Sequence, residues 1–527
     1  MAVAVYKSYS KSRRNFGDSQ NNMRTNKKKE FGDFQTPVTL CKDVINLIDK
    51  KYGKPDIIVE PTCGIGNFIE TAYNQWGKEI KYYGFELNEE YLSFAHQRFL
   101  HYENIELFQA DVFKFNWQSF FKRFAEEKIL LLGNPPWVTN SFLGTINSKN
   151  IPQKNNYNGL SGFESKTGKS NFDVAEWIII TLLKAINKKK VELAMLCKTS
   201  SARKVLLHLW KEKSVSDSSE LFRIDAKKYF NVSVDAVLLL INFERNINNI
   251  DKNIATFYDS LETDKYSFRF GLYKNKLVSD FDEFQKYKFL DGDSNYIWRS
   301  GIKHDASKVM ELTKKNGHLI NGLGEIVDIE ETLLYPLLKS SDLANERLQP
   351  TKFVIIPQKK LNEETEKIAR IAPKTWEYLN KHENLFNKRK SSIYKEKPKF
   401  SIFGIGNYTF AKWKVAISGL YKNFNFVIVP PYKDKPTILD DTCYFIPCLS
   451  KEEAEFWKEK LNSKECKSFI KSLVFYDSKR PITIEILKRI NFSELAKIHK
   501  QSDMGKKYLQ QAGMFNHSQL LIVFDKY

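Results

Sequence analysis

The sequence predicts an α/β protein with a doubly wound, mostly parallel sheet, followed by a second domain of mixed α+β structure. Between about residues 36 and 245, short apolar runs rich in β-branched residues alternate with segments of helical periodicity. This alternation is typical of an open sheet with helices on both faces. Beyond about residue 250, short strand-like pieces, aromatic residues and Lys-rich turns dominate instead. We expect an arm over 1–30, an α/β domain over 31–250 and a mixed domain over 251–527.

The individual elements of the first domain follow from the same periodicity. Residues 36–51 suit an amphipathic helix entered through Thr36 and Pro37, because proline fits the first turn of a helix. Asn88 suits the start of a later helix, because its side chain can cap free backbone N–H groups. In chain order, we expect helices over 36–51, 66–76, 88–100 and 173–186, and strands over 56–60, 81–86, 105–111, 128–134, 191–197 and 234–243. In such sheets, ligands bind beyond the carboxyl ends of the strands.

Composition narrows the class of partner. The chain of 527 residues carries a net charge of +20 and a pI of about 9.3, which favours a polyanionic partner such as nucleic acid. Residues 1–30 hold eight Lys or Arg against two acids, so we expect a basic, largely disordered arm there. No apolar run approaches the ~20 residues of a membrane span. The six cysteines form no CxxC pair, so we expect reduced thiols, no metal site and a cytoplasmic protein.

A glycine-containing turn and two strand-end acids are the first candidate binding residues. The stretch "VEPTCGIGNF" (59–68) leads from a strand through a Gly-x-Gly turn into a helix. The third glycine of a dinucleotide loop is missing, because Asn67 and Phe68 follow Gly66, so a cofactor without phosphates fits better. Glu86 can accept hydrogen bonds from a ribose diol, and Asp111 from the exocyclic amine of an adenine ring. Taken alone, Glu86 could be an exposed strand-end acid and Asp111 a helix cap.

The stretch "GNPPW" (133–137) is the most specific feature of the sequence. Asn134 carries one acceptor oxygen and two donor hydrogens. The two prolines have fixed φ and no N–H, so the carbonyl of Pro135 points in a set direction. The Asn134 oxygen and this carbonyl could therefore both accept hydrogen bonds from one planar amine. Trp137 adds a broad face on which a base could stack. The alternative is a tight turn with a buried tryptophan.

In the order strand–Gly-x-Gly–helix, strand–Glu, strand–Asp and strand–NPPW, the chain resembles the gamma-class N6-adenine DNA methyltransferases of bacterial restriction–modification systems. The resemblance covers roughly residues 31–245 and is looser beyond 250. It implies a Rossmann-like methyltransferase sheet, a C-terminal target-recognition domain and S-adenosyl-L-methionine as cofactor. The implied partners are double-stranded DNA and, functionally, a cognate restriction endonuclease, with no membrane.

The resemblance also implies roles for the matching residues. "FGDFQTP" (31–37), "EPTCGIGNF" (60–68) and "GKSNFDVAEW" (168–177) look like cofactor-side motifs, and "KYFNVSVDAV" (228–237) looks like the segment that supplies a second aromatic to the base. The implied cofactor residues are Thr36, Pro37, Glu60, Thr62, Cys63, Gly64, Gly66, Glu86, Asp111 and Asn134. The implied catalytic residues are Asn134, Pro135, Pro136 and Trp137, and the implied stacking pair is Trp137 and Phe230.

The mechanism expected from these residues needs no covalent nucleophile, because the methyl group of a sulfonium is already activated. Hydrogen bonds from the target amine to Asn134 and Pro135 would favour the pyramidal geometry of the transition state. The base must be flipped out of the duplex, and Trp137 and Phe230 would clamp it. Cys63 is then a small packing residue. Among basic and aromatic stretches of the second domain, the candidate DNA contacts are Arg299, Lys303, Arg389 and Lys412.

Three alternatives stay open at this point. Trp137 stands where adenine enzymes more often have Tyr or Phe, so a cytosine-N4 methyltransferase is the second choice. An Asn-Pro-Pro motif can serve any planar amine or amide, so an RNA or a protein amide is a further possible substrate. A bifunctional nuclease or a DNA-binding module with an inactive site is the third, although the acids at Glu60 and Asp111 and the amide at Asn134 are intact.

Overall fold

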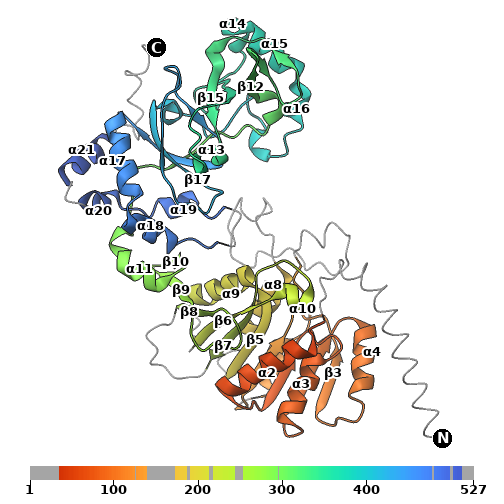
Figure 1. The fold of residues 1–527 in the computed structure, drawn as a ribbon. Helices are drawn as coiled ribbons and strands as arrows, with labels where there is room; N and C mark the ends of the chain where they lie inside the picture. The colour runs from red at the N-terminus through yellow and green to blue at the C-terminus, as the bar shows by residue number, and fades with distance from the viewer. Residues whose placement is uncertain are drawn as a thin grey trace. The chain divides into compact units, whose positions relative to one another are not determined.

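The computed structural model describes residues 35–138, 173–243, 253–498 and 502–512, apart from 125, 187–189, 213–215, 217, 295 and 477–479. The chain divides into two compact units, Met1–Leu277 and Val278–Tyr527 (Figure 1). This boundary differs from the one expected at 250, because the chain that follows residue 250 extends the sheet of the first unit. The arm expected over 1–30 lies outside the described residues.

The first unit is a ten-stranded sheet in the order β10-β9-β8-β6-β7-β5-β4-β1-β2-β3. Its strands are β1 Ile57–Glu60, β2 Lys81–Glu86, β3 Ile105–Gln109, β4 Ile129–Gly133, β5 Val191–Lys198, β6 Ser218–Ile224, β7 Ala236–Phe243, β8 Ile254–Tyr258, β9 Phe268–Tyr273 and β10 Lys276–Val278. Its helices are α2 Val38–Tyr52, α3 Asn67–Trp76, α4 Glu89–Arg98, α5 Trp117–Lys122, α8 Val174–Ala185, α9 Thr199–Lys211 and α10 Ala226–Phe230.

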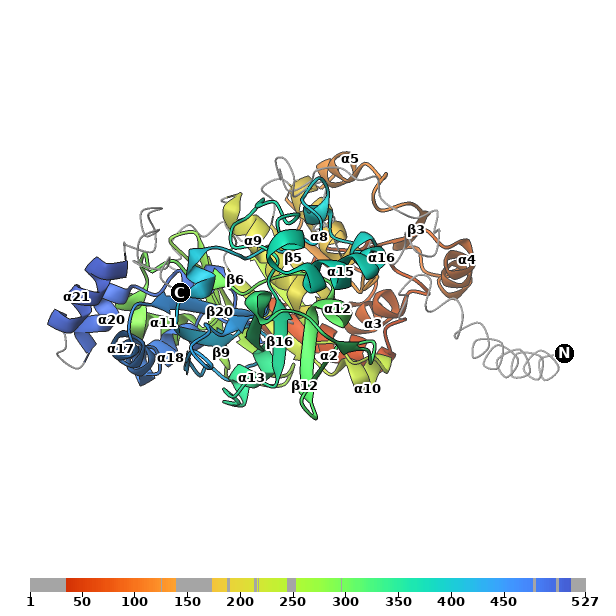
Figure 2. The same cartoon turned by 90° about the horizontal axis from the view of Figure 1, so that it is seen from above.

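The predicted α/β class is confirmed in this unit. Strands β3, β2, β1, β4 and β5 run parallel, and β7 enters antiparallel between β5 and β6. Helix α2 packs on α3, whereas α8 packs on α5 and α9. Seen from above, these two groups lie on opposite sides of the sheet (Figure 2). The sheet is therefore covered on both faces, as a doubly wound fold requires.

The carboxyl ends of the parallel strands place the candidate polar residues at one edge. Strands β1 and β4 are buried along their whole length, as expected for central strands. β1 ends at Glu60 and β2 at Glu86, and β4 ends one residue before Asn134. Asp111 follows β3 by two residues. Four separate sequence motifs are therefore gathered at the edge where such sheets bind ligands.

The second unit is a mixed α+β structure. A six-stranded sheet has the order β14-β13-β12-β16-β15-β19, and a four-stranded sheet has the order β11-β20-β17-β18. The strands are β11 Arg299–Ser300, β12 Glu311–Lys315, β13 His318–Ile320, β14 Ile326–Val327, β15 Leu334–Leu338, β16 Lys352–Ile355, β17 Trp413–Ser418, β18 Val427–Val429, β19 Ile438–Leu439 and β20 Cys443–Cys448.

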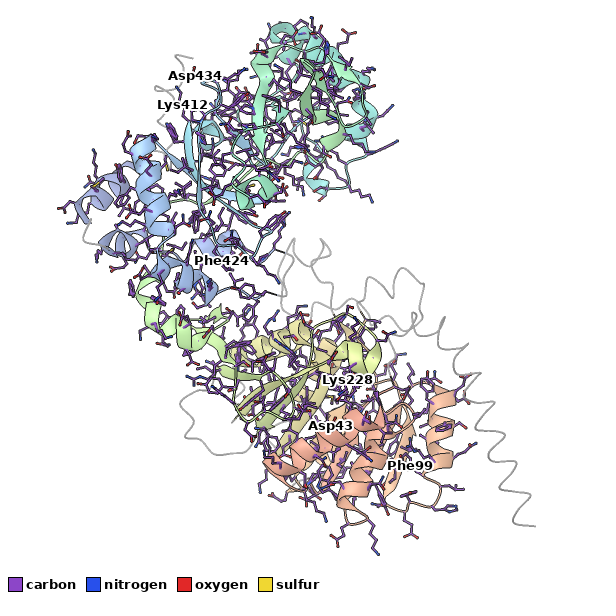
Figure 3. All side chains as sticks on the ribbon, viewed as in Figure 1. Asp43, Phe99, Lys228, Lys412, Phe424 and Asp434 are labelled. Atoms are coloured by element: carbon purple, nitrogen blue, oxygen red, sulfur yellow. The ribbon has the colours of Figure 1, made fainter. Side chains whose placement is uncertain are left out.

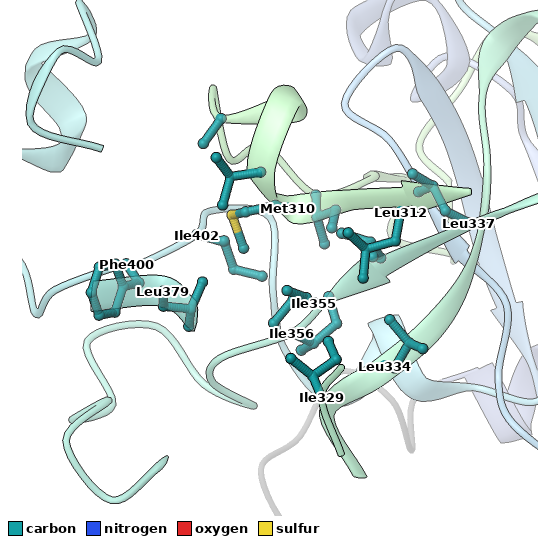
Figure 4. Packing of buried hydrophobic residues seen from close by; sticks show 14 of the residues in the cluster. Met310, Leu312, Ile329, Leu334, Leu337, Ile355, Ile356, Leu379, Phe400 and Ile402 are labelled. Atoms are coloured by element: carbon teal, nitrogen blue, oxygen red, sulfur yellow. The ribbon is translucent and has the colours of Figure 1, made fainter. Parts of the chain in front are cut away.

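Helices cover the sheets of the second unit. The α-helices are α11 Phe281–Tyr287, α12 Ser307–Met310, α13 Ser340–Ala344, α14 Ile368–Ile371, α15 Pro373–Lys381, α16 Glu383–Asn387, α17 Lys451–Leu461, α18 Lys464–Lys471, α19 Ile484–Leu487, α20 Phe492–Lys497 and α21 Ser502–Ala512. Short 3-10 helices are η1 Lys288–Leu290, η2 Glu331–Leu333, η3 Ser392–Tyr394 and η4 Asn407–Phe410. Met310, Leu312, Ile355, Leu379 and Phe400 belong to one buried cluster at the six-stranded sheet (Figure 4). Among the described residues, no helix is long and apolar enough to cross a membrane.

Candidate functional site

The glycine turn is bonded to the acid at the end of β2. The N–H of Gly64 donates to Oε2 of Glu86 at 2.8 Å, and the N–H of Asn88 donates to Oε1 at 2.8 Å. Gly64 has φ +54°, and a Cβ there would lie 2.5 Å from the Gln35 side chain, so only glycine fits without a shift. Two backbone groups therefore hold the Glu86 carboxylate against the turn. A carboxylate has about four acceptor positions, which is compatible with a further pair of bonds to a ribose diol.

The residue that follows the Gly-x-Gly turn joins two helices. Asn67 donates from Nδ2 to the carbonyl oxygen of Thr36 at 2.8 Å. Arg98 of α4 donates to Oδ1 of Asn67 at 2.8 Å and to the carbonyl oxygen of Ile65 at 3.0 Å, and it also pairs with Glu70. Asn67 thus ties the start of α3 to the segment that enters α2. Sequence reasoning missed this role, although an amide directly after the Gly-x-Gly turn was its signal.

Gly66, Thr36 and Pro37 complete the turn. Gly66 has φ +81°, and a Cβ there would meet the ring of Phe99 at 2.5 Å. Phe99 is labelled beside α4 in Figure 3. Thr36 is buried, and Pro37 directly precedes α2, as the sequence predicted. The first residues of the matching motif, 31–34, lie outside the described residues.

Glu60 and Thr62 present buried acceptors at the end of β1. Within the described part of the chain, Oε2 of Glu60 and Oγ1 of Thr62 are buried and have no hydrogen-bond partner. Burial, and then the negative charge of Glu86, raises the pKa of the Glu60 carboxyl well above its usual range. Buried polar atoms without partners are costly, so they point to a ligand with donor groups at this place. The site therefore fits the amino acid end of S-adenosylmethionine.

Cys63 lies inside this turn as a packing residue. Its side chain is 4 % exposed, and its thiol lies 3.9 Å from the carbonyl oxygen of the neighbouring Gly64. Burial raises the pKa of the Cys63 thiol, and Glu60 and Glu86 raise it further. A thiol in such surroundings stays neutral and is a poor nucleophile.

The residues that follow β2 and β3 form the other side of the candidate cofactor site. Oδ1 of Asp111 accepts from the N–H of Phe113 at 2.9 Å, and its side chain is 27 % exposed. Leu87 follows Glu86 and is 45 % exposed. Sequence reasoning missed Leu87, although an apolar residue directly after a strand-end acid was a usable signal. An apolar surface beside two acids suits a purine ring.

The Asn-Pro-Pro-Trp corner is held firmly at its tryptophan. Trp137 is 6 % exposed, and its indole Nε1–H donates to the carbonyl oxygen of Leu196 at 3.3 Å. The ammonium of Lys198 donates to the carbonyl oxygen of Trp137 at 2.8 Å. Pro135 is buried, and Asn134 is partly exposed at the edge of the sheet. The corner is therefore fixed by β5, and the Asn134 side chain is partly exposed although its Oδ1 is buried.

The structure brings Trp137 and Phe230 together, but their rings are in direct contact with each other and do not enclose a space for a base. Their ring centroids are 5.2 Å apart and the planes are inclined by 72°, which is an edge-to-face contact. A base stacked between two parallel rings needs a gap of about 7 Å, twice the contact distance of about 3.5 Å. Phe230 ends α10, which is anchored to α2 because the Tyr229 hydroxyl donates to Asp43 at 3.2 Å. Asp43 is labelled in Figure 3.

The four candidate DNA contacts have different surroundings. The guanidinium of Arg299 lies over the ring of Tyr408 at 4.4 Å from its centroid. Lys303 is 3.6 Å from a carboxylate oxygen of Asp305. Lys412 is exposed and is labelled in Figure 3. Lysines and stacked arginines at the surface are suited to phosphates and bases.

Arg389 differs from the other three. Its Nη1 donates to the carbonyl oxygen of Ser401 at 2.7 Å and to that of His304 at 3.3 Å, and its guanidinium lies 3.7 Å from the ring centroid of Tyr394. Burial lowers the pKa of Arg389 from its usual value. These contacts are those of a residue that joins two loops of the protein.

Comparison with known proteins identifies the class of enzyme. The chain belongs to the N-6 DNA methylases of restriction–modification systems, as the motifs predicted. The model of that family matches residues 20–265. The type II methyltransferase M.NspV of Nostoc sp. (strain ATCC 29411 / PCC 7524) is 45% identical over 476 residues, which cover 89% of this chain and 98% of the relative. S-adenosyl-L-methionine is accordingly the cofactor.

Solved structures with similar coordinates include the type IIL restriction–modification enzyme MmeI in complex with DNA. It is 12% identical, with a TM-score of 0.43 over 95% of this chain and 73% of that chain. A putative class I S-adenosylmethionine-dependent methyltransferase from Listeria monocytogenes is 14% identical, with a TM-score of 0.31 over 44% of this chain and 67% of that chain.

Proposed function

We propose that the protein transfers a methyl group from S-adenosylmethionine to the exocyclic N6 amine of an adenine flipped out of double-stranded DNA. It would act as the modification component that protects DNA from a cognate restriction endonuclease. The observation that carries this proposal is the Asn134–Trp137 corner at the same sheet edge as Glu60, Glu86 and Asp111. Membership of the N-6 DNA methylase family favours adenine over cytosine.

In this proposal, the residues at the ends of β1, β2 and β3 bind and orient the cofactor. Glu60 and Thr62 accept hydrogen bonds from its ammonium group, Glu86 accepts from the ribose hydroxyls, and Asp111 accepts from the adenine amine. Leu87 covers one face of the adenine ring. Once bound, the cofactor supplies a methyl group that is activated by its sulfonium.

The corner activates the acceptor amine. The Asn134 side-chain oxygen and the Pro135 carbonyl accept the two N–H groups of the target amine, which is flat and poorly nucleophilic in the ground state. These hydrogen bonds become stronger as the amine becomes pyramidal, so they lower the barrier to methyl transfer. The base reaches the corner only after it leaves the duplex stack.

Stacking in the site needs a local change. Because Trp137 and Phe230 touch edge to face, a flipped base can stack on Trp137 only if the Phe230 ring turns or shifts. The two rings therefore enclose the base only once it enters. Before that, no gap for a base lies between these two residues.

The second unit supplies the DNA contacts in this proposal, with Arg299, Lys303 and Lys412 at the DNA. Arg299 is the best candidate for reading a base, because its guanidinium lies over the ring of Tyr408. Arg389 instead supports the loops, because it donates to the carbonyls of Ser401 and His304.

Methylation of duplex DNA, RNA and protein by the full chain tests the substrate class, and single-molecule sequencing of methylated DNA identifies the base. We expect N6-methyladenine at a defined duplex sequence. N4-methylcytosine would instead support the second candidate, which the tryptophan in the corner motif favours. Asn134→Ala should abolish methyl transfer while cofactor binding survives. An Asn134→Ala enzyme that methylates duplex DNA at near the wild-type rate would show that the catalytic assignment is wrong.

A further inference from the structure

Lys198, at the end of β5, bonds the catalytic corner to the start of α8. Its ammonium donates to the carbonyl oxygen of Trp137 at 2.8 Å and to Oδ2 of Asp173 at 2.7 Å. Asp173 precedes α8, and its Oδ1 accepts from the N–H of Ala175 at 3.1 Å. One lysine thus joins the corner, the end of β5 and the start of α8.

The surroundings of this lysine favour a fixed arrangement. The side chain of Lys198 is 23% exposed and that of Asp173 is 6% exposed, so the ion pair is largely removed from water. Burial raises the pKa of the Asp173 carboxyl, and the nearby charge of Lys198 opposes that rise. A partly buried pair that also makes hydrogen bonds holds its geometry better than a surface pair does.

A second set of bonds acts on the same corner. The indole of Trp137 donates to the carbonyl oxygen of Leu196, two residues before Lys198 on β5. The N–H of Val174, one residue after Asp173, donates to the carbonyl oxygen of Val138 at 2.9 Å. The side chain of Trp137 and the peptides on its C-terminal side are therefore each held by a separate bond.

We infer that Lys198 is a positioning residue for methyl transfer. It acts through Trp137 and does not itself contact the reacting atoms. By fixing the peptide after Trp137, it sets the plane of the indole and the direction of the Pro135 carbonyl two residues earlier. Misplacement of reacting groups by about 1 Å can lower a rate by about 100-fold, so a small release of the corner has a large kinetic effect. This inference depends on the proposed function of the corner.

A lysine on the helix that follows β5 provides a matched control for Lys198. Lys204 of α9 also pairs with a buried carboxylate of α8, because its Nζ lies 2.9 Å from Oε2 of Glu176. Both lysines therefore join a buried acid at the start of α8 to the β5–α9 segment. Lys198 differs by its additional bond to Trp137 and by its lower exposure, 23% against 51% for Lys204. Comparison of Lys198→Met with Lys204→Met separates this bond from the loss of an ion pair.

The test measures single-turnover methylation of plasmid DNA by the full-length enzyme, together with equilibrium binding of S-adenosylmethionine and thermal unfolding. We expect Lys198→Met to lower the single-turnover rate by about 10- to 100-fold, with cofactor Kd within twofold of wild type. Lys204→Met should retain a rate within about threefold. A Lys198→Met enzyme as fast as Lys204→Met would overturn the inference, as would a defect confined to cofactor Kd.

Two further results keep the inference separate from its premise. If the wild-type chain does not methylate duplex DNA, the proposed function fails before the lysine is considered. If Lys198→Met does not fold, the comparison uses Asp173→Asn, which keeps a side-chain acceptor for Ala175 but removes the charge that holds Lys198. That variant should lose several-fold in single-turnover rate with its cofactor Kd retained. An unchanged rate in Asp173→Asn would then overturn the inference.

Discussion

Replacement of Glu60 by glutamine should remove the pH dependence of cofactor binding. Glu60 is buried at the end of β1, and burial together with the charge of Glu86 holds the pKa of its carboxyl well above the usual value of 4.5. Without cofactor, burial therefore favours the neutral form of Glu60 more than water would. An ammonium group bound beside Oε2 favours the ionised form instead. Binding of S-adenosylmethionine should thus release one proton from Glu60.

The sign and size of the effect follow from this linkage. Below the folded-state pKa of Glu60, each unit by which the pH falls should weaken cofactor binding about tenfold, because one proton must leave Glu60 when the cofactor binds. Above that pKa, the affinity should become independent of pH. The stability of the fold depends on pH in the opposite sense. Because the folded-state pKa of the Glu60 carboxyl is raised, its contribution to stability is complete below pH 4.5 and is lost as the pH rises through the folded-state pKa. At high pH, Glu60→Gln replaces a charged acceptor and should lose about 1.5–3 kcal/mol, about 10- to 150-fold in Kd.

Calorimetric titration with S-adenosylmethionine between pH 5.5 and 8.5 measures both quantities, and titration in buffers of different ionisation enthalpy counts the released protons. Glu79→Gln is the matched control, because Glu79 is an exposed acid of the same unit that pairs with Lys54. It should keep the wild-type profile. If Glu60→Gln keeps the same pH slope as wild type, or binds as tightly at pH 8.5, the pairing of Glu60 with the cofactor ammonium is wrong.

The remaining predictions concern the cofactor turn and the DNA surface. Asn67→Ala removes hydrogen bonds to Thr36 and Arg98, so at about 1 kcal/mol each it should weaken cofactor binding by up to about 30-fold in Kd. Asn104→Ala, which loses its bond to the Ile80 carbonyl elsewhere in the unit, should leave cofactor Kd unchanged in the same calorimetric titration. Arg299→Ala should raise the KM for DNA and relax the methylated sequence as mapped by sequencing. Arg389→Ala should mainly lower the unfolding temperature, and the reverse pattern for these two arginines would refute their assignment.

Local sequence patterns predicted the elements that carry the site. The strand expected over 81–86 is β2 with the same bounds, and Asn88 caps α4 by accepting from the N–H groups of Glu90 and Tyr91. These features depend on residue spacing within a few positions, which the sequence displays directly. The strand-end acids were also predictable, because the end of an apolar run marks the carboxyl edge of a parallel sheet.

Features set by pairing between distant segments were not predictable in this way. The antiparallel entry of β7 between β5 and β6 and the extension of the sheet by β8, β9 and β10 depend on strand order, which apolar runs do not encode. The same limit applies to Lys198, which contacts Trp137 across 61 positions of sequence. A lysine at the end of an apolar strand reads as an ordinary solvated residue until its partner is placed.

The contact between Trp137 and Phe230 gives the catalytic corner two competing occupants. An aromatic pair of this kind contributes about 0.5–1.5 kcal/mol, whereas a base stacked on an aromatic ring contributes about 1–3 kcal/mol. A flipped base therefore gains little more from stacking than the protein loses when Phe230 moves away. In the proposed mechanism, the remaining preference for the flipped base would come from the hydrogen bonds to Asn134 and Pro135, which require an exocyclic amine. A base without such an amine would gain only this small stacking difference, so displacement of the Phe230 ring would favour bases that carry an exocyclic amine.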